Sequence, residues 1–315
     1  MALLPLQTGI LYGPVNSRRL GRSLGINLLP SRYKLCSFDC LYCHYGRTQV
    51  KTLSPGKKYL PDLPSVAAVL QAVEEALRTR RDFDYITFSG NGEPTLHPHF
   101  PEIVAGINRL RDQLRPEVKL AILSNSTTVH RPHVQEILRL LDASIMKLDA
   151  GDPRTLAGLN RPAAAARLEH IIAGLQHVPG LVVQSVLVDG PVSNVQGQAF
   201  AAWLAALPEV RPTQVQIYST DRPVAEAAVQ RPRCRSTAPI APWPRLPWRG
   251  CHRLLCSAWP PRSNSERGFP STPTGPRDEE DRDERDIANR SRTGCSGAGT
   301  GLGQNVVSGA PGARA

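Results

Sequence analysis

The feature that most constrains the fold of this chain is the alternation of short apolar runs with helix-like stretches, which continues up to about Gln230. Apolar residues recur every three or four positions over residues 64–80, and this spacing predicts an amphipathic helix. The run Tyr85–Phe88 follows and predicts a buried strand. Similar signals predict strands near residues 24–28, 120–123, 144–148, 182–187 and 215–218, and helices near residues 103–114, 132–141, 163–176 and 195–207.

Strands that alternate with helices predict a parallel sheet whose helices lie on the outside. Right-handed crossovers curl such a sheet into a barrel or part of one. The predicted fold class is therefore α/β, a partial (β/α)6 TIM-like barrel. Ligands of such sheets bind at the carboxyl ends of the strands. A run of cysteines follows the strand near residues 24–28, so we expect the cysteines at that end.

The alternation stops at Arg231, after which lysine is absent and arginine and proline are frequent. A helix is expected to begin at Pro223–Gln230 and is then cut off. The composition of residues 231–315 predicts either a disordered tail or the product of a shifted reading frame, and we favour the frame shift. We therefore expect one α/β domain over residues 1–230 and a low-complexity tail over residues 231–315.

Bulk properties place the chain in a reducing compartment. It has seven cysteines without regular pairing and no secretory opening segment, which predicts a cytoplasmic protein. No apolar run is long enough to span a membrane, so no membrane partner is expected. The formal net charge of +11 indicates an anionic partner. Roughly half of that excess lies after Arg231, however, and this weakens the indication.

Three cysteines, Cys36, Cys40 and Cys43, are spaced C-x3-C-x2-C, with Tyr42 directly before the last. Three thiolates can hold three irons of a four-iron cluster and leave the fourth iron open. An open iron can bind a small molecule and pass an electron to it. The run therefore indicates redox chemistry more than a structural metal.

Other interpretations of this run remain open. With His44 as a fourth ligand it could hold structural zinc, although zinc ligands usually come as two separated pairs. Cys40–His44 also reads as the attachment motif C-x-x-C-H of c-type haem, which ignores Cys36. Cys40 and Cys43 could instead form a redox dithiol. In the tail, Cys251 and Cys256 could hold a second cluster, but a segment with little apolar periodicity cannot pre-shape a metal site.

Polar or glycine-rich segments follow the predicted strands. Ser89–Thr95 contains Gly90, Gly92 and Glu93, so its backbone can approach a ligand closely and its carboxylate can accept from an amine. The next strand is followed by Ser124–Thr128, whose hydroxyls and amide suit a ribose or a carboxylate. A capped turn and a helix N-cap are the structural alternatives. Further on, Lys147 and Asp149 share one strand face and read either as site residues or as an interior ion pair.

The cysteine motif C-x3-C-x-aromatic-C and the turn Gly-x-Gly-Glu-Pro together resemble the radical S-adenosylmethionine (SAM) superfamily. The resemblance covers about residues 10–230. Within the superfamily the chain is most similar to uncharacterised iron–sulfur oxidoreductases related to tRNA wyosine synthase and to the molybdenum-cofactor A protein. The stretches that carry this similarity are Tyr12–Gly21, Ser89–Pro98 and Asp189–Asn194.

The resemblance implies a [4Fe–4S] cluster on Cys36, Cys40 and Cys43, and S-adenosyl-L-methionine as the second cofactor. It places Tyr42 against the adenine. It implies that Gly90, Gly92 and Glu93 line the methionine amino group, and that Asn125 and Ser126 lie near the ribose or the carboxylate.

The activity that the resemblance implies is a metal-binding oxidoreductase or transferase that cleaves SAM to a 5′-deoxyadenosyl radical. This radical abstracts hydrogen from an unidentified nucleotide, tRNA base or small metabolite. A low-potential electron donor of the flavodoxin or ferredoxin type is implied as a partner. The extra clusters of the two named relatives have no matching cysteines here, so neither reaction is transferred.

Alternative functions also stay open. The chain could be an activase that installs a radical on a partner protein, a zinc-stabilised nucleic-acid-binding module, or a truncated product without function. Basic residues near the site allow an RNA or another phosphate-bearing substrate, with a solvated basic face as the alternative. They are Arg18, Arg19, Arg22, Arg32, Lys34, Arg47, Lys51, Lys57 and Lys58.

Overall fold

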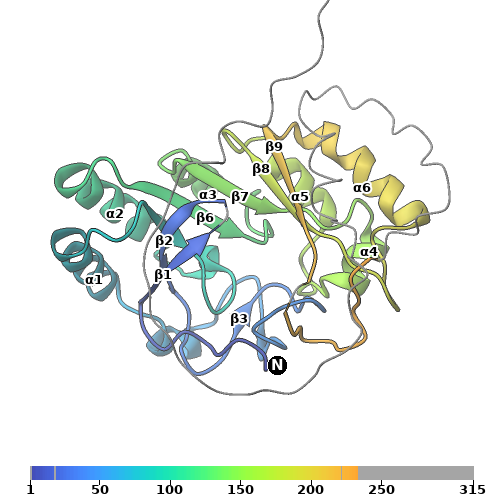
Figure 1. The fold of residues 1–315 in the computed structure, drawn as a ribbon, viewed down its shortest axis with the longest axis horizontal. Helices are drawn as coiled ribbons and strands as arrows, with labels where there is room; N and C mark the ends of the chain where they lie inside the picture. The colour runs from blue at the N-terminus through green and yellow to red at the C-terminus, as the bar shows by residue number, and fades with distance from the viewer. Residues whose placement is uncertain (1, 18, 221, 233–315) are drawn as a thin grey trace, which may run out of the picture. The chain divides into compact units, whose positions relative to one another are not determined.

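The main sheet of the computed structural model has seven strands in the order β1-β2-β5-β6-β7-β8-β9 (Figure 1). Residues 2–17, 19–220 and 222–232 are described. The strands are β1 (Leu11–Ser17), β2 (Gly21–Ile26), β5 (Tyr85–Phe88), β6 (Lys119–Ser124), β7 (Ala143–Lys147), β8 (Val182–Val186) and β9 (Gln214–Tyr218). Strands β2 and β5–β9 are parallel, which confirms the α/β fold class and is compatible with a partial TIM-like barrel. Apart from residues 231 and 232, the predicted tail lies outside the described residues.

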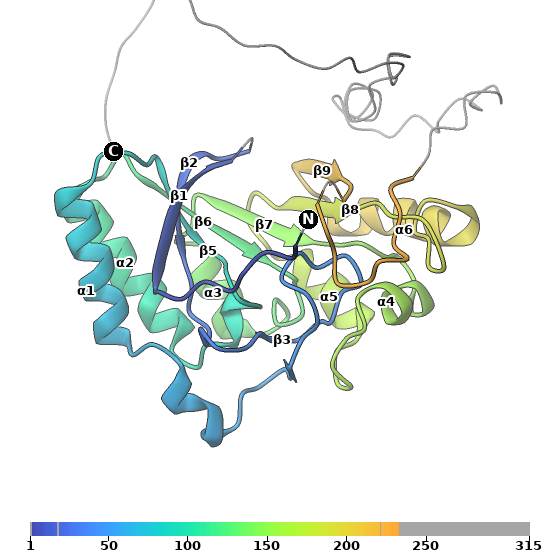
Figure 2. The ribbon, with the colours of Figure 1, turned by 60° about the horizontal axis from the view of Figure 1, so that its bottom comes forward.

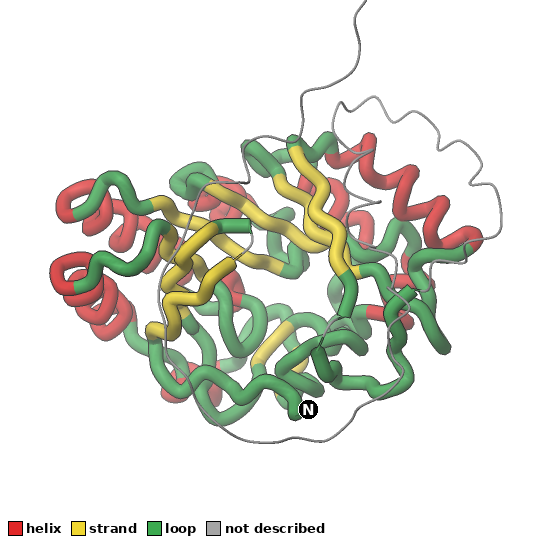
Figure 3. The backbone as a smooth tube through the Cα atoms, in the orientation of Figure 1, coloured by secondary structure: helices red, strands yellow, loops and turns green. Residues whose placement is uncertain are grey.

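Helices cover the outer side of this sheet (Figures 2 and 3). They are α1 (Val66–Thr79), α2 (Phe100–Leu114), α3 (Pro132–Leu138), α4 (Pro153–Leu159), α5 (Leu168–Leu175) and α6 (Gly197–Val210). Two 3-10 helices, η1 (Lys57–Asp62) and η2 (Pro94–Leu96), and the two-stranded pair β3 (Leu35–Cys36) and β4 (Val50–Lys51) lie in the connections. No helix within the described ranges is long and apolar enough to cross a lipid bilayer.

Helix α1 forms where the apolar spacing predicts it. The side chain of Ser65 caps its first turn by accepting from the Ala68 amide at 3.2 Å. Val69, Val73 and Leu77 are buried along one face and join the large core cluster between helices and sheet. Burial of each such side chain stabilises the fold by about 1.5–3 kcal/mol, so packing rather than intrinsic propensity holds this helix.

One strand of the main sheet and one α-helix were not predicted, nor were the short elements β3, β4, η1 and η2. Strand β1 pairs antiparallel with β2 at the edge of the sheet, and its Gly13 and Pro14 interrupt the period-two pattern that would have indicated a strand. Helix α4 is too short to give a clear 3.6-residue period, although the side chain of Asp152 caps it by accepting from the Thr155 amide at 2.8 Å.

Two predicted helices differ from the structure. Helix α5 begins at Leu168 rather than near residue 163, because Ala163 is held in a turn whose amide donates to the Ser37 carbonyl at 2.8 Å. Residues 223–230 form turns and an isolated bridge to Asp189 instead of a helix. The amides of Ala225, Glu226 and Gln230 bond to distant segments, so these three do not form helical bonds.

The inner face of the sheet becomes polar toward the carboxyl ends of the strands. Strand pairing aligns Lys147 with Gln184, and Gln184 with Gln216, in one row across β7, β8 and β9. Strands of parallel sheets are usually buried on both faces. Leu123 on β6 is nevertheless 37% exposed, so side chains do not fill the inner face at that point.

Asn194 ties the ends of β7 and β8 together. Its amide nitrogen donates to the Asp149 carbonyl at 2.9 Å and to the Val186 carbonyl at 2.7 Å, and its amide oxygen accepts from the Val188 amide at 2.9 Å. Asn194→Ala leaves these buried groups unpaired, and we expect it to lower the free energy of unfolding by about 3 kcal/mol. Urea denaturation followed by circular dichroism measures this loss.

Asn16→Ala is the matched control for this measurement. Asn16 lies on the edge strand β1 and is exposed. Its replacement should change the free energy of unfolding by less than about 0.5 kcal/mol. Equal losses in the two variants would contradict the role assigned to Asn194.

Candidate functional site

The cysteine segment, residues 35–46, lies against the turn that follows β5. The Leu35 amide donates to the Asn91 carbonyl at 3.2 Å, and the Glu93 amide donates to the Leu35 carbonyl at 3.4 Å. Gly92 makes this approach possible, because a Cβ atom at its position would lie 1.7 Å from the Leu35 carbonyl oxygen and its φ is +149°. Two of the predicted strand-end motifs are therefore in direct contact.

Backbone bonds from distant parts of the chain hold the rest of the cysteine segment. The cysteine segment donates hydrogen bonds to carbonyl groups at the end of α4. It accepts hydrogen bonds from amides of residues 222–232 and of the N-terminal stretch. The bonds are Asp39 N to Asn160 O at 2.9 Å, Leu41 N to Leu159 O at 3.0 Å, Glu226 N to Leu41 O at 2.9 Å, Ala225 N to Cys43 O at 3.0 Å and Leu4 N to His44 O at 2.9 Å. The shape of the segment is thus set by its surroundings and not by regular secondary structure of its own.

Each of the three cysteine sulfurs accepts a hydrogen bond from a side-chain nitrogen on a different segment. The donors are Asn125 Nδ2 to Cys36 Sγ at 3.4 Å, Asn160 Nδ2 to Cys40 Sγ at 3.4 Å and Lys34 Nζ to Cys43 Sγ at 3.0 Å. Donors directed at sulfur stabilise negative charge on it and shift the potential of sulfur-bound iron. The arrangement suits thiolate ligands.

Burial disfavours the charged form of two of these thiols when no metal is bound. It raises the pKa of Cys36 to about 12 and that of Cys40 to about 11. Lys34 opposes this effect at Cys36, because its positive charge favours the thiolate. Formation of the thiolates therefore depends on a bound cation or cluster.

The ammonium group of Lys34 is buried beside the cysteines. Lys34 is 3% exposed, and its Nζ also donates to the Gly46 carbonyl at 2.9 Å. Burial lowers its pKa, but the negative charge of the thiolates, that of Cys43 first, outweighs burial and raises the pKa overall. The sequence interpretation placed this lysine near the site, in a basic cluster suited to a phosphate-bearing substrate, and missed its burial beside the cysteines. A lysine two positions before the first cysteine was the available signal.

Glu93 is buried where the turns after β5 and β6 meet. Its Oε1 accepts from Thr95 N at 3.2 Å, from Thr95 Oγ1 at 2.7 Å and from Ser124 Oγ at 2.9 Å. Its Oε2 accepts from Asn125 N at 2.6 Å, and a carboxylate oxygen has the lone pairs to accept a second hydrogen bond. Burial raises the pKa of Glu93, while these hydrogen bonds act in the opposite direction. The carboxylate therefore joins two strand ends and retains one acceptor position.

The structure brings the predicted residue Asn125 to the cysteine segment, whereas the side chain of the predicted Ser126 bonds to the end of β7. Asn125 Nδ2 also donates to Ser37 Oγ at 2.9 Å, and its Oδ1 accepts from the Thr127 amide at 3.1 Å. Ser126 Oγ donates to the Lys147 carbonyl at 2.8 Å, and its φ is +71°. Both residues thus shape the end of β6.

Tyr42 belongs to a polar cluster at the end of β7. Its hydroxyl donates to Asp149 Oδ2, which also accepts from Asn160 Nδ2 at 2.9 Å. Lys147 Nζ lies 3.4 Å from Asp149 Oδ1 and 5.0 Å from the centre of the Tyr42 ring. The pair of Lys147 and Asp149 is thus an interior ion pair, and it also fixes Tyr42. Asn160, which the sequence interpretation missed, is in contact with all of these groups except Lys147 and has an unpaired buried Oδ1.

The predicted basic cluster does not form one free surface. Lys34 is buried, Arg22 pairs with Asp84 at 2.7 Å and Arg47 pairs with Asp39 at 3.2 Å. Arg18 lies outside the described residues. Arg19, Arg32, Lys57 and Lys58 are exposed, so part of the predicted cluster remains at the surface.

Two further features bear on metal and ligand binding. Within the described ranges, no group of three His, Cys, Asp or Glu side chains is arranged to hold a metal ion. A four-iron cluster does not require three ligands around one ion, because each cysteine binds a separate iron.

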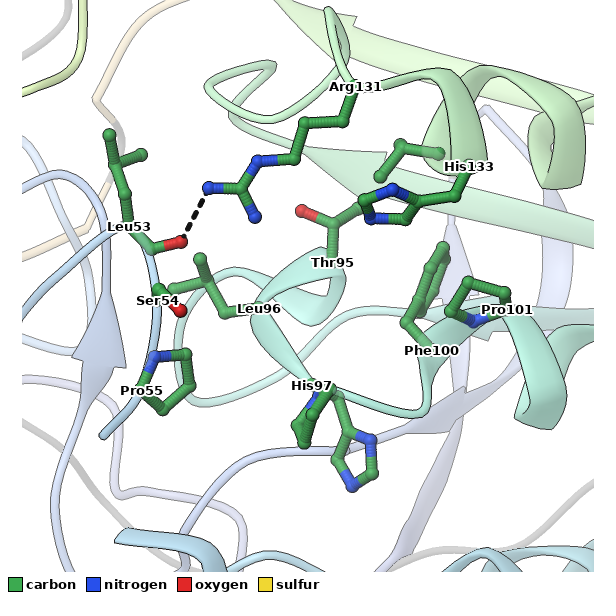
Figure 4. Close-up of a pocket in the computed structure, with 12 residues that line it drawn as sticks. Leu53, Ser54, Pro55, Thr95, Leu96, His97, Phe100, Pro101, Arg131 and His133 are labelled. Atoms are coloured by element: carbon green, nitrogen blue, oxygen red, sulfur yellow. Dashed lines mark hydrogen bonds between the residues drawn. The ribbon is translucent and has the colours of Figure 1, made fainter. Parts of the chain in front are cut away.

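A cavity of about 200 Å³ lies outside the cysteine site, between residues 53–55, η2 and the starts of α2 and α3. Figure 4 shows Arg131 reaching across it, with Nη2 donating to the Leu53 carbonyl at 2.9 Å.

Comparison with known proteins identifies the family. The sequence model of the family described as "Radical SAM superfamily" matches residues 31–191. A UPF0026 protein of Methanocaldococcus jannaschii is 30% identical over 71% of this chain and 67% of its own length. A UPF0026 protein of Synechocystis is 35% identical over 67% of this chain and 76% of its own length. A structure of TYW1 with a lysine–pyruvate adduct bound has a TM-score of 0.46 and 13% identity, and covers 67% of this chain and 69% of that chain.

The chain therefore belongs to the radical SAM superfamily, as its two motifs predict.

Gly92→Ala tests the contact between the cysteine segment and the turn after β5. The added methyl group meets the Leu35 carbonyl and the backbone is held at positive φ, so we expect the apoprotein to lose about 3 kcal/mol of unfolding free energy. Gly56→Ala is the control, because nothing lies within 4 Å of its added Cβ. It should change stability by less than about 1 kcal/mol. Equal urea denaturation curves for the two variants would refute the contact.

The raised pKa values predict slow alkylation of Cys36 and Cys40 in the folded apoprotein. At pH 8 a thiol with a pKa of about 12 is ionised in roughly one molecule in ten thousand, and thiolate is the reactive form. Iodoacetamide labelling followed by peptide mass spectrometry should find both residues unmodified until urea unfolds the protein. Rapid labelling of both before unfolding would show that they are not buried as thiols.

Proposed function

We propose that the chain is a radical SAM enzyme that holds a [4Fe–4S] cluster on Cys36, Cys40 and Cys43. The observation that carries this proposal is the set of nitrogen donors, one on each cysteine sulfur, together with the buried Lys34 ammonium. In the described part of the chain no carboxylate pairs with that ammonium. Three thiolates bound to iron would supply the missing negative charge.

The residues around the cysteines also fit S-adenosyl-L-methionine. Gly90 and Gly92 have φ of +126° and +149°. A Cβ atom at Gly90 would lie 2.6 Å from Asn27 Oδ1, and one at Gly92 would lie 1.7 Å from the Leu35 carbonyl oxygen, so the turn keeps this shape and its close packing only with glycine at both positions. Glu93 Oε2 retains an acceptor position that suits a cationic amine. The unpaired Oδ1 of Asn160 beside Tyr42 is an acceptor that suits an N–H or O–H donor of a bound molecule.

When bound, the cluster and SAM supply one-electron reductive cleavage of the sulfonium to a 5′-deoxyadenosyl radical. The role of the chain's own residues is to bind and orient the cluster and SAM and to exclude water from the site. Tyr42, held by Asp149 and Asn160, presents a fixed ring for the adenine. The backbone from Gly90 to Glu93 positions the methionine amine. Asn125 holds the end of β6 against the cysteine segment and Ser126 bonds it to the end of β7, close to where we place the ribose or the carboxylate.

The inner face of the sheet is the proposed place for the substrate, because it adjoins the cysteine segment and carries Lys147 and the exposed Leu123. A nucleotide, a tRNA base or a small metabolite stays the substrate proposal, and a flavodoxin- or ferredoxin-type protein stays the proposed donor. We propose residues 1–230 as the radical SAM domain and residues 231–315 as a low-complexity tail.

Anaerobic reconstitution of the full chain tests this function. We expect about four irons and four sulfides per chain, and release of 5′-deoxyadenosine when SAM and dithionite are added. Cys40→Ala should abolish release because one cluster ligand is lost. Iron analysis, sulfide analysis and chromatography of the products give the measurement.

Cys251→Ala is the matched control for that experiment. Cys251 belongs to the tail and not to the C-x3-C-x2-C run, so its removal should leave the iron content and the product yield unchanged. A wild-type chain with a complete cluster and no release of 5′-deoxyadenosine would count against the proposal, and zinc bound without sulfide would favour a zinc module.

A further inference from the structure

The charge state of Lys34 distinguishes it from the other donors to the cysteine sulfurs. Asn125 and Asn160 donate from neutral amides at 3.4 Å, whereas Lys34 donates from an ammonium at 3.0 Å. Hydrogen bonds from charged donors are shorter and stronger than those from neutral donors. Among these three donors, Lys34 alone adds a full positive charge to the ligand set.

In the part of the chain that the structure describes, no carboxylate gives this ammonium a counter-charge. Its two hydrogen-bond acceptors are Cys43 Sγ and the Gly46 carbonyl oxygen, and no carboxylate within the described ranges forms an ion pair with it. Burial of an unpaired charge is strongly unfavourable. Negative charge on the cysteines therefore stabilises the buried Lys34 ammonium, and a larger negative charge stabilises it more.

A fixed positive charge acts differently on the two oxidation states of a cluster. Addition of one electron makes the cluster and its thiolates more negative by one unit. A nearby ammonium in surroundings of low dielectric stabilises the more negative state more strongly. Its presence therefore raises the reduction potential, and its removal lowers it.

We propose that Lys34 is a positioning residue that sets the reduction potential of the cluster held by Cys36, Cys40 and Cys43. Its charge makes the cluster easier to reduce by one electron from a low-potential flavin or iron–sulfur donor. This inference rests on the proposed function, because it requires that the cysteines bind a cluster. It goes further by assigning the control of electron entry to one side chain.

Substitution of Lys34 tests the inference through the potential itself. Lys34→Gln removes the charge and keeps an N–H donor, and Lys34→Met removes both. After reconstitution, an EPR-monitored titration with dithionite should find the one-electron reduction equilibrium of both variants about tenfold less favourable, a downward shift of about 59 mV. Lys34→Arg, which retains the charge, should restore most of the wild-type potential.

Lys119→Met is the matched control. Lys119 is an exposed lysine at the start of β6, at the amino ends of the strands and opposite the cysteine segment. Its replacement should leave the potential unchanged. Equal potentials for wild type, Lys34→Gln and Lys34→Met, each with a complete cluster, would overturn the inference.

The apoprotein provides a second measurement if the uncharged variants fail to retain iron. In the apoprotein the Lys34 ammonium lacks the negative charge of a bound cluster. Its removal should therefore leave the melting temperature of the apoprotein unchanged or higher. Cluster loss with this unchanged stability, and rescue by Lys34→Arg, would support the inference. A lower melting temperature in both uncharged variants would overturn it in favour of a structural role. A wild-type chain that binds no iron and sulfide would instead refute the proposed function.

Discussion

The backbone hydrogen bonds of the cysteine segment are the interactions on which the candidate site depends. Apart from two-residue β3, the segment has no strand or helix of its own, and it bonds to the turn after β5, to the end of α4 and to residues 225 and 226. Every one of these partners stands at the end of a sheet or helix element, or follows one. The positions of the three sulfurs are therefore determined by the parallel sheet as a whole, which explains why a short and irregular segment can hold a defined geometry.

Most polar groups around the cysteines are satisfied by other groups of the chain. Asn125 and Asp149 each accept or donate several internal bonds. Among the described residues around the cysteines, the Lys34 charge lacks a carboxylate partner and the Oδ1 of Asn160 lacks a hydrogen-bond donor, while Glu93 Oε2 accepts a single bond. A buried polar atom without any partner is rare in folded proteins, so Lys34 and Asn160 in particular point to groups that the site binds. These side chains combine a cation for anionic sulfur with acceptors for donor groups of a small molecule.

The sequence predicts much of this fold because its signals are local. Apolar spacing predicts α1, and short apolar runs predict the parallel strands from β2 to β9. The cysteine spacing and the Gly-x-Gly-Glu-Pro turn predict the family. Other features depend on contacts between distant segments and cannot be read locally. In the sequence, Lys34 looks like a surface charge, and only the fold of the cysteine segment buries it. Asn160 looks like the end of a short helix, although its side chain bonds to Cys40. Residues 223–230 have a helical composition, but amides among them bond to the cysteine segment instead.

The contact between the cysteine segment and residues 223–226 has a consequence for the order of assembly. The bond from His44 to Pro223 joins groups 179 positions apart in the chain. During synthesis the thiols therefore emerge long before the segment that encloses them, and such long-range closures form late in folding. In that interval the thiols are exposed to oxidants and to competing metals. Iron delivered after release from the ribosome would reach a folded site. Iron delivered earlier would reach an unfolded segment whose thiols are still exposed.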